Sequence, residues 1–149
     1  MGNKARFIFL ALLLLALIGF VDSFIIHQKV AGLIYAPCVI GQGCDTVLNS
    51  YYSNFLGVPL SYWGMAFYGV IIVLLSLRLS LNKIIFENAY YICIACGSLF
   101  SLYLFYVQIF DIKAICTYCT ISFSDVIISF VLSGYIINKK RLIASGRSI

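Results

Sequence analysis

The sequence has few charged residues for its length. Only 10% of its 149 residues are charged, whereas 63% are hydrophobic and the mean hydropathy is +1.06. A soluble domain of this size needs a polar surface that so few charges cannot cover, so the composition excludes an ordinary soluble domain and a disordered chain. The remaining surface must contact lipid, which indicates a membrane protein.

Histidine is almost absent too, and the basic residues do not form a nucleic-acid-binding pattern. His27 is the only histidine, so a zinc site would have to use cysteines and carboxylates in closed tetrahedral geometry. The ten Lys and Arg residues lie between apolar runs rather than among aromatic residues, and they give a net charge of +5. This placement argues against a nucleic-acid partner and indicates topology in the membrane instead.

Four apolar runs are long enough to cross a hydrocarbon core about 30 Å thick. They cover residues 7–26, 60–79, 89–110 and 116–137. The first run is too long for a signal peptide and lacks a small-residue cleavage site. The predicted fold class is therefore an all-α membrane protein, a four-transmembrane-helix bundle, with residues 1–149 as one domain.

The basic residues also predict how the bundle is oriented. All Lys and Arg residues except Lys29 and Lys113 flank the same side of the four spans, so the positive-inside rule places both termini in the cytoplasm. Residues 27–59 then form an extracytoplasmic loop. Within this loop, apolar residues recur at helical spacing between Cys44 and Gly57. We expect a short amphipathic helix there, which caps the outer end of the bundle together with the loop.

Six cysteines in so short a chain need a redox or metal explanation. The last two, Cys116 and Cys119, open the fourth span as Cys-x-x-Cys. At a helix start, backbone N–H groups without helical partners and the helix dipole favour a thiolate at the first sulfur, which suits thiol–disulfide exchange. Half of a zinc site and a pair of buried thiols are the alternatives.

The other cysteines form two further pairs. Cys38 and Cys44 lie in the outer loop, where a structural disulfide is the alternative to a redox role. Two dithiols on one face of the membrane suit the passage of electrons by successive exchanges. Cys93 and Cys96 lie toward the cytoplasmic end of the third span, about 25 to 30 Å from Cys116 along a helix rising about 1.5 Å per residue. We expect them to be structural.

Ionisable residues inside a membrane are candidates for function. Asp22 lies about one turn below the outer end of the first span, near the expected depth of Cys119, where it could receive protons. Asp125 points about 180° away from Cys116 on an ideal helix, so we expect it to bond to a neighbouring helix. His27 is expected to anchor the outer interface, with proton handling as the alternative.

The order and spacing of several motifs resemble the vitamin K epoxide reductase family, in its bacterial and archaeal thiol-oxidising branch. The motifs are Cys38, Cys44-Asp-Thr-Val-Leu-Asn-Ser50, Gly57-Val-Pro59-Leu-Ser-Tyr-Trp-Gly64 with Tyr68, Ser101-Leu-Tyr-Leu and Cys116-Thr-Tyr-Cys119. In the DsbB-type quinone reductases, which are similar in helix number and cysteine pairs, the Cys-x-x-Cys comes first. Here it comes second.

The resemblance implies a role for each site residue. Cys38 would form the mixed disulfide with a thioredoxin-like, DsbA-like partner, Cys44 would pass electrons to Cys116, and Cys119 would face a membrane quinone. Ser50 would lie at the quinone end of the loop helix. The quinone pocket would be lined by Val47, Leu48, Tyr52, Leu60, Trp63, Phe67, Leu104 and Phe123. The chain ends at Ile149 without a fused thioredoxin-like domain, so the partner is expected to be a separate protein.

The predicted activity is therefore a quinone-dependent, protein-disulfide-generating oxidoreductase. We expect a multi-pass protein of the inner or plasma membrane, with the active site on the extracytoplasmic side, ubiquinone or menaquinone as cofactor and no metal. One alternative is a vitamin K quinone or epoxide reductase, which is disfavoured because Leu60 and Phe123 replace an Asn and a Tyr of the animal members. Another is a non-catalytic tetraspan scaffold with structural disulfides.

Overall fold

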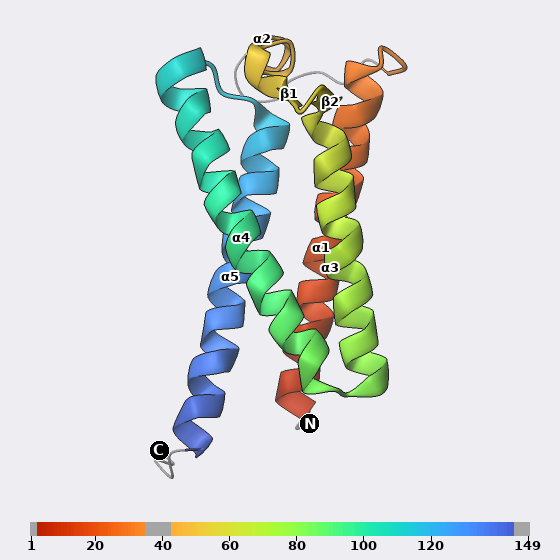
Figure 1. Ribbon diagram of the computed structural model, residues 1–149, viewed down its shortest axis with the longest axis vertical. Coiled ribbons are helices and arrows are strands. Elements are labelled where there is room, and N and C mark those ends of the chain that lie inside the picture. Colours follow the sequence, from red (N-terminus) through yellow and green to blue (C-terminus); the bar gives the residue numbers. More distant parts are fainter. Residues whose placement is uncertain (1–2, 35–42, 145–149) are drawn as a thin grey trace.

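Four long helices and a small cap make up the fold. The computed structural model describes residues 3–34 and 43–144. The start of α1 and the end of α5 lie at one end of the bundle, and the cap lies at the other (Figure 1). The elements, in chain order, are α1 (Asn3–Val30), α2 (Cys44–Leu48), a 3₁₀ turn (Tyr51–Ser53), β1 (Asn54–Phe55), β2 (Val58–Pro59), α3 (Leu60–Leu81), α4 (Ile84–Val107), a π-helical turn (Gln108–Ile112) and α5 (Thr117–Ala144).

The four long helices confirm the predicted membrane bundle. Stretches of 25, 22, 29 and 22 residues are long and apolar enough to cross a membrane, namely Arg6–Val30, Leu60–Leu81, Ile84–Ile112 and Thr117–Asn138. Helix α1 packs most extensively against α3, while α5 packs against α4 and α1. Away from the cap, these helices enclose one continuous apolar core that includes Phe9, Leu12, Ile71, Leu75, Tyr90 and Ile94.

A buried ion pair explains why α4 is longer than predicted. The helix begins at Ile84 and includes Glu87, which is 1% exposed. Arg78 of α3 donates from Nε to Glu87 Oε2 at 2.9 Å, and the hydroxyl of Tyr91 donates to Glu87 Oε1 at 2.8 Å. The sequence estimate started the span after this charge. Because the carboxylate is paired and hydrogen-bonded, it is accommodated within the helix.

The cap contains less helix than predicted, because α2 ends at Leu48 instead of continuing to Gly57. Ser50 has extended backbone angles (φ −72°, ψ 161°), and its hydroxyl donates to the carbonyl of Val47 at 2.7 Å. A serine that bonds to the local backbone in this way competes with the helical hydrogen-bond ladder. The α-helix of the cap therefore ends before Ser50.

A small hairpin occupies the rest of the predicted helix. Leu56 and Gly57 have positive φ angles of 55° and 77°, and Phe55 pairs with Val58 across them. Two consecutive positive φ angles in a two-residue loop are typical of a type I′ hairpin turn. The spacing that suggested one helix involved five residues. Four of them line one cavity, namely Val47, Leu48, Tyr52 and Phe55, whereas Tyr51 is exposed.

Candidate functional site

A cavity of about 660 Å³ lies between the cap and the cap-proximal halves of the helices. Helices α3 and α4 diverge toward the cap, as Figure 1 shows. The volume lies within the range of small-molecule and cofactor sites, roughly 300–1,000 Å³. The residues expected to bind a quinone all lie on its wall: Val47, Leu48, Tyr52, Leu60, Trp63, Phe67, Leu104 and Phe123. Ser50 lies on the same wall.

At the cap end of the cavity, Cys44 and Cys116 pack in one buried cluster with Val47. The two cysteines are 1% and 0% exposed. Cys44 is disulfide-bonded, whereas Cys116 and Cys119 are free thiols. Cys38, the expected contact point for a protein partner, lies outside the described residues. The fold therefore brings Cys44, from the cap, next to the first thiol of the Cys-x-x-Cys pair.

Cys116 occupies the position directly before α5, where the helix start affects its acidity. The thiol of Cys119 donates a hydrogen bond to Cys116, and the backbone N–H groups of Cys119 and Tyr118 add two more. Together with the positive charge of Lys29, these donors outweigh burial and lower the pKa of Cys116 to about 7. A substantial fraction of this sulfur is therefore the nucleophilic thiolate at neutral pH.

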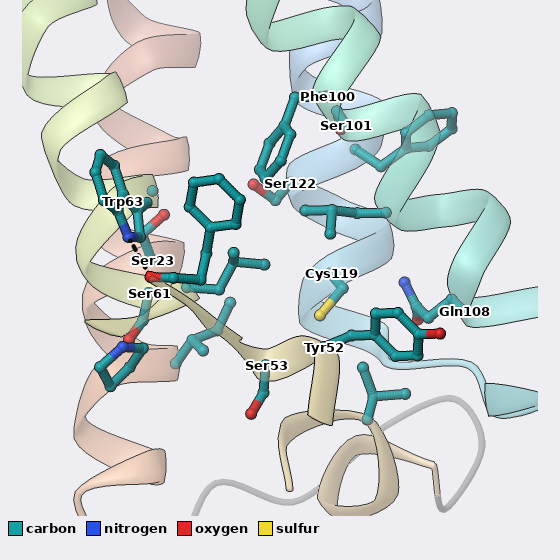
Figure 2. A pocket seen from close by; sticks show the side chains of 18 of the residues that line it. Ser23, Tyr52, Ser53, Ser61, Trp63, Phe100, Ser101, Gln108, Cys119 and Ser122 are labelled. Atoms are coloured by element: carbon teal, nitrogen blue, oxygen red, sulfur yellow. Dashed lines mark hydrogen bonds between the residues drawn. The ribbon is translucent and has the colours of Figure 1, made fainter. Parts of the chain in front are cut away.

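Cys119 lies one turn into α5 and faces a different compartment from Cys116. Its sulfur points into the cavity, with Tyr52 of the cap beside it (Figure 2). The two thiols of one Cys-x-x-Cys pair thus connect two environments: Cys116 contacts the buried cluster under the cap, and Cys119 contacts the apolar cavity. This arrangement suits transfer of electrons from the cap to a hydrophobic molecule bound in the cavity.

Gln108 supports this arrangement and was missed in the sequence analysis. It begins the π-helical turn at the end of α4, and it is 4% exposed. Its Oε1 accepts a hydrogen bond of 2.7 Å from the backbone N–H of Cys116. Gln108 therefore satisfies a buried donor directly before α5 and holds Cys116 at the end of α4. The sequence feature that could have identified Gln108 is that it is a single amide side chain at the end of an otherwise apolar run.

Two polar side chains on the cavity wall already donate hydrogen bonds to backbone carbonyls of the cap. The hydroxyl of Ser50 donates to the carbonyl of Val47, and the indole N–H of Trp63 donates to the carbonyl of Phe55 at 3.2 Å (Figure 2). These hydrogen bonds connect the cap to itself and to α3. Hydrogen bonds to a bound molecule would therefore come from other polar side chains on the wall, such as Tyr68 and Ser122, in addition to shape and aromatic contacts.

The cavity also reaches the second Cys-x-x-Cys pair. Cys93 and Cys96 line it from α4, together with Cys119 from α5. From their estimated distance to Cys116, we expected these two cysteines to lie away from the site. That expectation is wrong, because the cavity extends into the bundle as far as both of them. Both cysteines are free thiols. They lie in the interior of α4, where the backbone N–H groups are used by the helix.

Asp22 and Asp125 are both 6% exposed. The Tyr68 hydroxyl on α3 interacts with the Asp125 carboxylate, in keeping with the expected contact to a neighbouring helix, although in the described part of the chain neither Asp125 oxygen has a partner at full hydrogen-bond geometry. One oxygen of Asp22 is in the same situation. The ring of His27 packs against that of Tyr62 with centroids 4.4 Å apart, in keeping with an anchoring role. Among residues 3–34 and 43–144, no three His, Cys, Asp or Glu side chains are grouped as a metal site would need.

A comparison with protein families gives one match for this chain. Residues 10–134 match the model described as the vitamin K epoxide reductase family. The matched region contains the cap, all six cysteines and the entire wall of the cavity.

Proposed function

Because the chain belongs to the vitamin K epoxide reductase family, whose members are membrane oxidoreductases, we propose that it oxidises dithiols of an extracytoplasmic thioredoxin-like protein and reduces a membrane quinone. The net reaction is partner dithiol plus quinone, giving partner disulfide plus quinol. Two electrons and two protons pass from sulfur to the quinone, and the protein regains its starting state after each cycle.

The path of the electrons follows the order of the four cysteines. The partner thiolate attacks the Cys38–Cys44 disulfide at Cys38, and the resolving partner thiol releases the partner as a disulfide. The Cys44 thiolate then reduces a Cys116–Cys119 disulfide by attacking Cys116. The second thiol of the loop pair resolves that mixed disulfide, which leaves both α5 cysteines reduced. The contribution of Cys38 rests on the family resemblance.

One observation carries this proposal. The buried cluster of Cys44, Val47 and Cys116 joins directly to the cavity through Cys119. An exchange between Cys44 and Cys116 needs the sulfurs to approach within a disulfide bond length, and a shared buried cluster brings them near each other without water. The lowered pKa of Cys116, about 7, gives the pair a good leaving thiolate during the exchange.

The cavity wall suits a quinone ring and its apolar tail. The rings of Phe105 and Phe123 stack at 4.3 Å and 6° between planes on one part of the wall. Tyr52, Trp63 and Phe67 add further aromatic surface. A bound quinone supplies the two-electron oxidising chemistry, and the protein residues bind the ring, exclude water and hold Cys119 against it. Ubiquinone and menaquinone are both compatible with such apolar contacts.

Thiol oxidation is favoured over epoxide reduction by the same wall. Leu60 and Phe123 line the cavity, and neither side chain has a hydrogen-bond donor or a group that could protonate an epoxide oxygen.

For the orientation, we propose that the cap faces the extracytoplasmic side of the inner or plasma membrane, with both termini in the cytoplasm. The positive-inside distribution of Lys and Arg supports that orientation.

A trapped mixed disulfide tests the electron path. In a Cys38→Ala, Cys119→Ala double variant, the resolving thiols of both pairs are missing, so peptide mapping without reductant should find Cys44 joined to Cys116. The matched control is Cys38→Ala, Cys96→Ala, in which Cys119 can still resolve the bridge and the trapped species should be scarce. Free Cys44 and Cys116 in an oxidised, folded double variant would contradict the proposed order.

A second measurement tests the acceptor. Purified wild-type protein should reduce decyl-ubiquinone or a short-tailed menaquinone analogue when a dithiol protein is supplied, and Cys119→Ala should not. Cysteines that never change redox state, with no reduction of either quinone, would favour a structural scaffold instead.

A further inference from the structure

Tyr68 connects three helices at the wall of the cavity. It lies on α3 and is 3% exposed. A Cβ atom at Gly19 of α1 would overlap its ring, so the glycine allows the ring to pass across α1. At the far end, the Tyr68 hydroxyl lies 3.0 Å from the hydroxyl of Ser122 and 3.3 Å from the Ser122 carbonyl, both on α5. Tyr68, Ser122 and Cys119 all line the cavity.

Two carboxyl groups lie next to this hydroxyl pair. Asp22 is one turn from Gly19 on α1, and Asp125 is one turn from Ser122 on α5. Asp22 interacts electrostatically with Cys116, Cys119, Tyr68 and Asp125. Asp22 Oδ2 is buried without a hydrogen-bond partner in the part of the chain that the structure describes. The oxygens of Asp125 have no partner at full hydrogen-bond geometry there, but this carboxylate interacts with the Tyr68 hydroxyl.

A buried carboxyl without a partner is costly, especially within a membrane span. Two that interact hold a shared proton more easily than they hold two negative charges. Burial, the electrostatic interaction with both thiols and one buried oxygen atom without a hydrogen-bond partner among the described residues together identify Asp22 as a group that can take up and release a proton beside Cys119.

The proposed reaction needs such a group. Oxidation of the Cys116–Cys119 dithiol breaks two S–H bonds and forms one S–S bond, and the quinone takes up two electrons and two protons. Cys116 lies outside the membrane span, at the cap, and its pKa of about 7 allows its proton to leave on that side. Cys119 faces an apolar cavity, so its proton needs a route through protein groups.

We propose that Asp22, Tyr68 and Ser122 form a proton-transfer path between the Cys119 thiol and the quinone in the cavity. Asp22 accepts the proton when the S–H bond of Cys119 breaks. The hydroxyls of Tyr68 and Ser122, each able to donate and accept, pass a proton to the quinone oxygen. Cys119 loses one proton and one quinone oxygen gains it through the path. Cys116 loses the other proton to water at the cap, and the second quinone oxygen takes up one proton from that water, so two protons leave sulfur, two reach the quinone and the charge of the path is unchanged after each cycle. This inference rests on the proposed function.

The test measures the quinone half-reaction alone. Full-length protein in lipid nanodiscs is reduced, freed of reductant and mixed with decyl-ubiquinone, and the loss of quinone absorbance is followed by stopped flow. Asp22→Asn and Tyr68→Phe should each slow this step about 100-fold, the lower end of the usual contribution of proton transfer by a positioned side chain. Asp22→Glu should restore most of the rate. Exchange between the partner dithiol and the loop disulfide should stay unchanged.

Tyr90→Phe is the matched control. The hydroxyl of Tyr90 also bonds to a serine of α5, at 2.9 Å from Ser133 Oγ, but Tyr90 belongs to the apolar core rather than to the cavity wall. Its rate should equal that of the wild type. A second readout separates proton transfer from structure: formate, a small carboxylate that can replace the missing side-chain carboxyl, should accelerate Asp22→Asn and leave Tyr90→Phe unaffected.

Two results would overturn the proton path. One is a rate within twofold of the wild type in both Asp22→Asn and Tyr68→Phe. The other is a slow Asp22→Asn whose rate formate does not restore, together with a slow Asp22→Glu, since that pattern indicates a structural role. Failure of the proposed function looks different, because the wild-type protein itself would then leave both decyl-ubiquinone and a menaquinone analogue oxidised.

Discussion

The protein contains two Cys-x-x-Cys pairs near one cavity, which Cys93, Cys96 and Cys119 line, but the pairs occupy different places in their helices. Cys116 precedes the first turn of α5, where a hydrogen bond from the Cys119 thiol, together with the backbone N–H groups of Cys119 and Tyr118, lowers its pKa to about 7. Cys93 and Cys96 lie inside α4 (Ile84–Val107), where the helix uses those N–H groups for its own hydrogen bonds. Spacing alone therefore does not make a redox pair. We expect the α5 pair to be the redox-active one because it lies at a helix start.

The two pairs also differ in what they contact besides the cavity. Cys116 belongs to the cluster that contains Cys44, whereas Cys93 packs against the apolar core of the bundle. A sulfur can take part in a chain of exchanges only if another sulfur can reach it in line. Only the α5 pair has a further cysteine beside it among the described residues, so we expect only this pair to conduct electrons from the cap.

The largest expected difference is in activity. Cys116→Ala and Cys119→Ala should each abolish growth-linked disulfide formation in a bacterium that lacks its own membrane thiol oxidase, because a dithiol relay stops when one sulfur is missing. Cys93→Ala and Cys96→Ala, at matched expression, should behave like the wild type. Loss of complementation in Cys93→Ala, with normal folding, would remove the distinction between the two pairs.

The pairs should next differ in how their reactivity depends on pH. Alkylation of Cys116 by iodoacetamide in reduced protein should follow its thiolate fraction, with a midpoint near the pKa of about 7 instead of the ordinary 9.0. Because its pKa is lowered, Cys116 remains a reactive thiolate at a lower pH than an ordinary cysteine does. Going from about pH 8 to about pH 6 should slow alkylation roughly tenfold, as expected for a group that titrates in between. Mass spectrometry of the labelled peptide gives the rate.

Lys29 supplies a matched test of the cause. Its Nζ lies 3.2 Å from Asp45 Oδ1, and its charge favours the Cys116 thiolate. Lys29→Gln should therefore raise the alkylation midpoint, whereas Lys113→Gln, at the other cation expected on this side, should leave it in place. Equal midpoints in the wild type and both variants would assign the lowered pKa entirely to Cys119 and the helix start.

The smallest expected effect concerns which part of the cavity holds the quinone ring. Phe123 lies one turn below Cys119 and stacks on Phe105. Replacing it with Leu keeps an apolar side chain but removes an aromatic contact of about 1 kcal/mol, so the KM for quinone should rise about fivefold. Cys96→Ser, on the α4 part of the wall, should leave the KM unchanged. The reverse result in steady-state quinone reduction would place the ring beside the α4 pair.

The helices were predictable because lipid imposes a simple rule. An apolar run of about 20 residues has to span the bilayer as a helix that satisfies its own backbone. One error came from a contact between two helices, and the other came from local hydrogen bonding and a tight turn. Arg78 allowed Glu87 into α4, and the bond from Ser50 to Val47, followed by the turn at Leu56, replaced the second half of the expected cap helix. None of these partners is evident from residue spacing alone.

The sequence by itself determined the membrane location, the number of spans, the order of the cysteine pairs and the position of Cys116 at a helix start, because each depends on neighbours within a few residues or on one continuous apolar run. Only the tertiary structure decided that Cys44 packs with Cys116, that Gln108 bonds to the backbone of Cys116, and that Tyr68 reaches Ser122. These contacts join residues from different elements. They depend on how helices cross and where they diverge, which local propensity and periodicity do not specify.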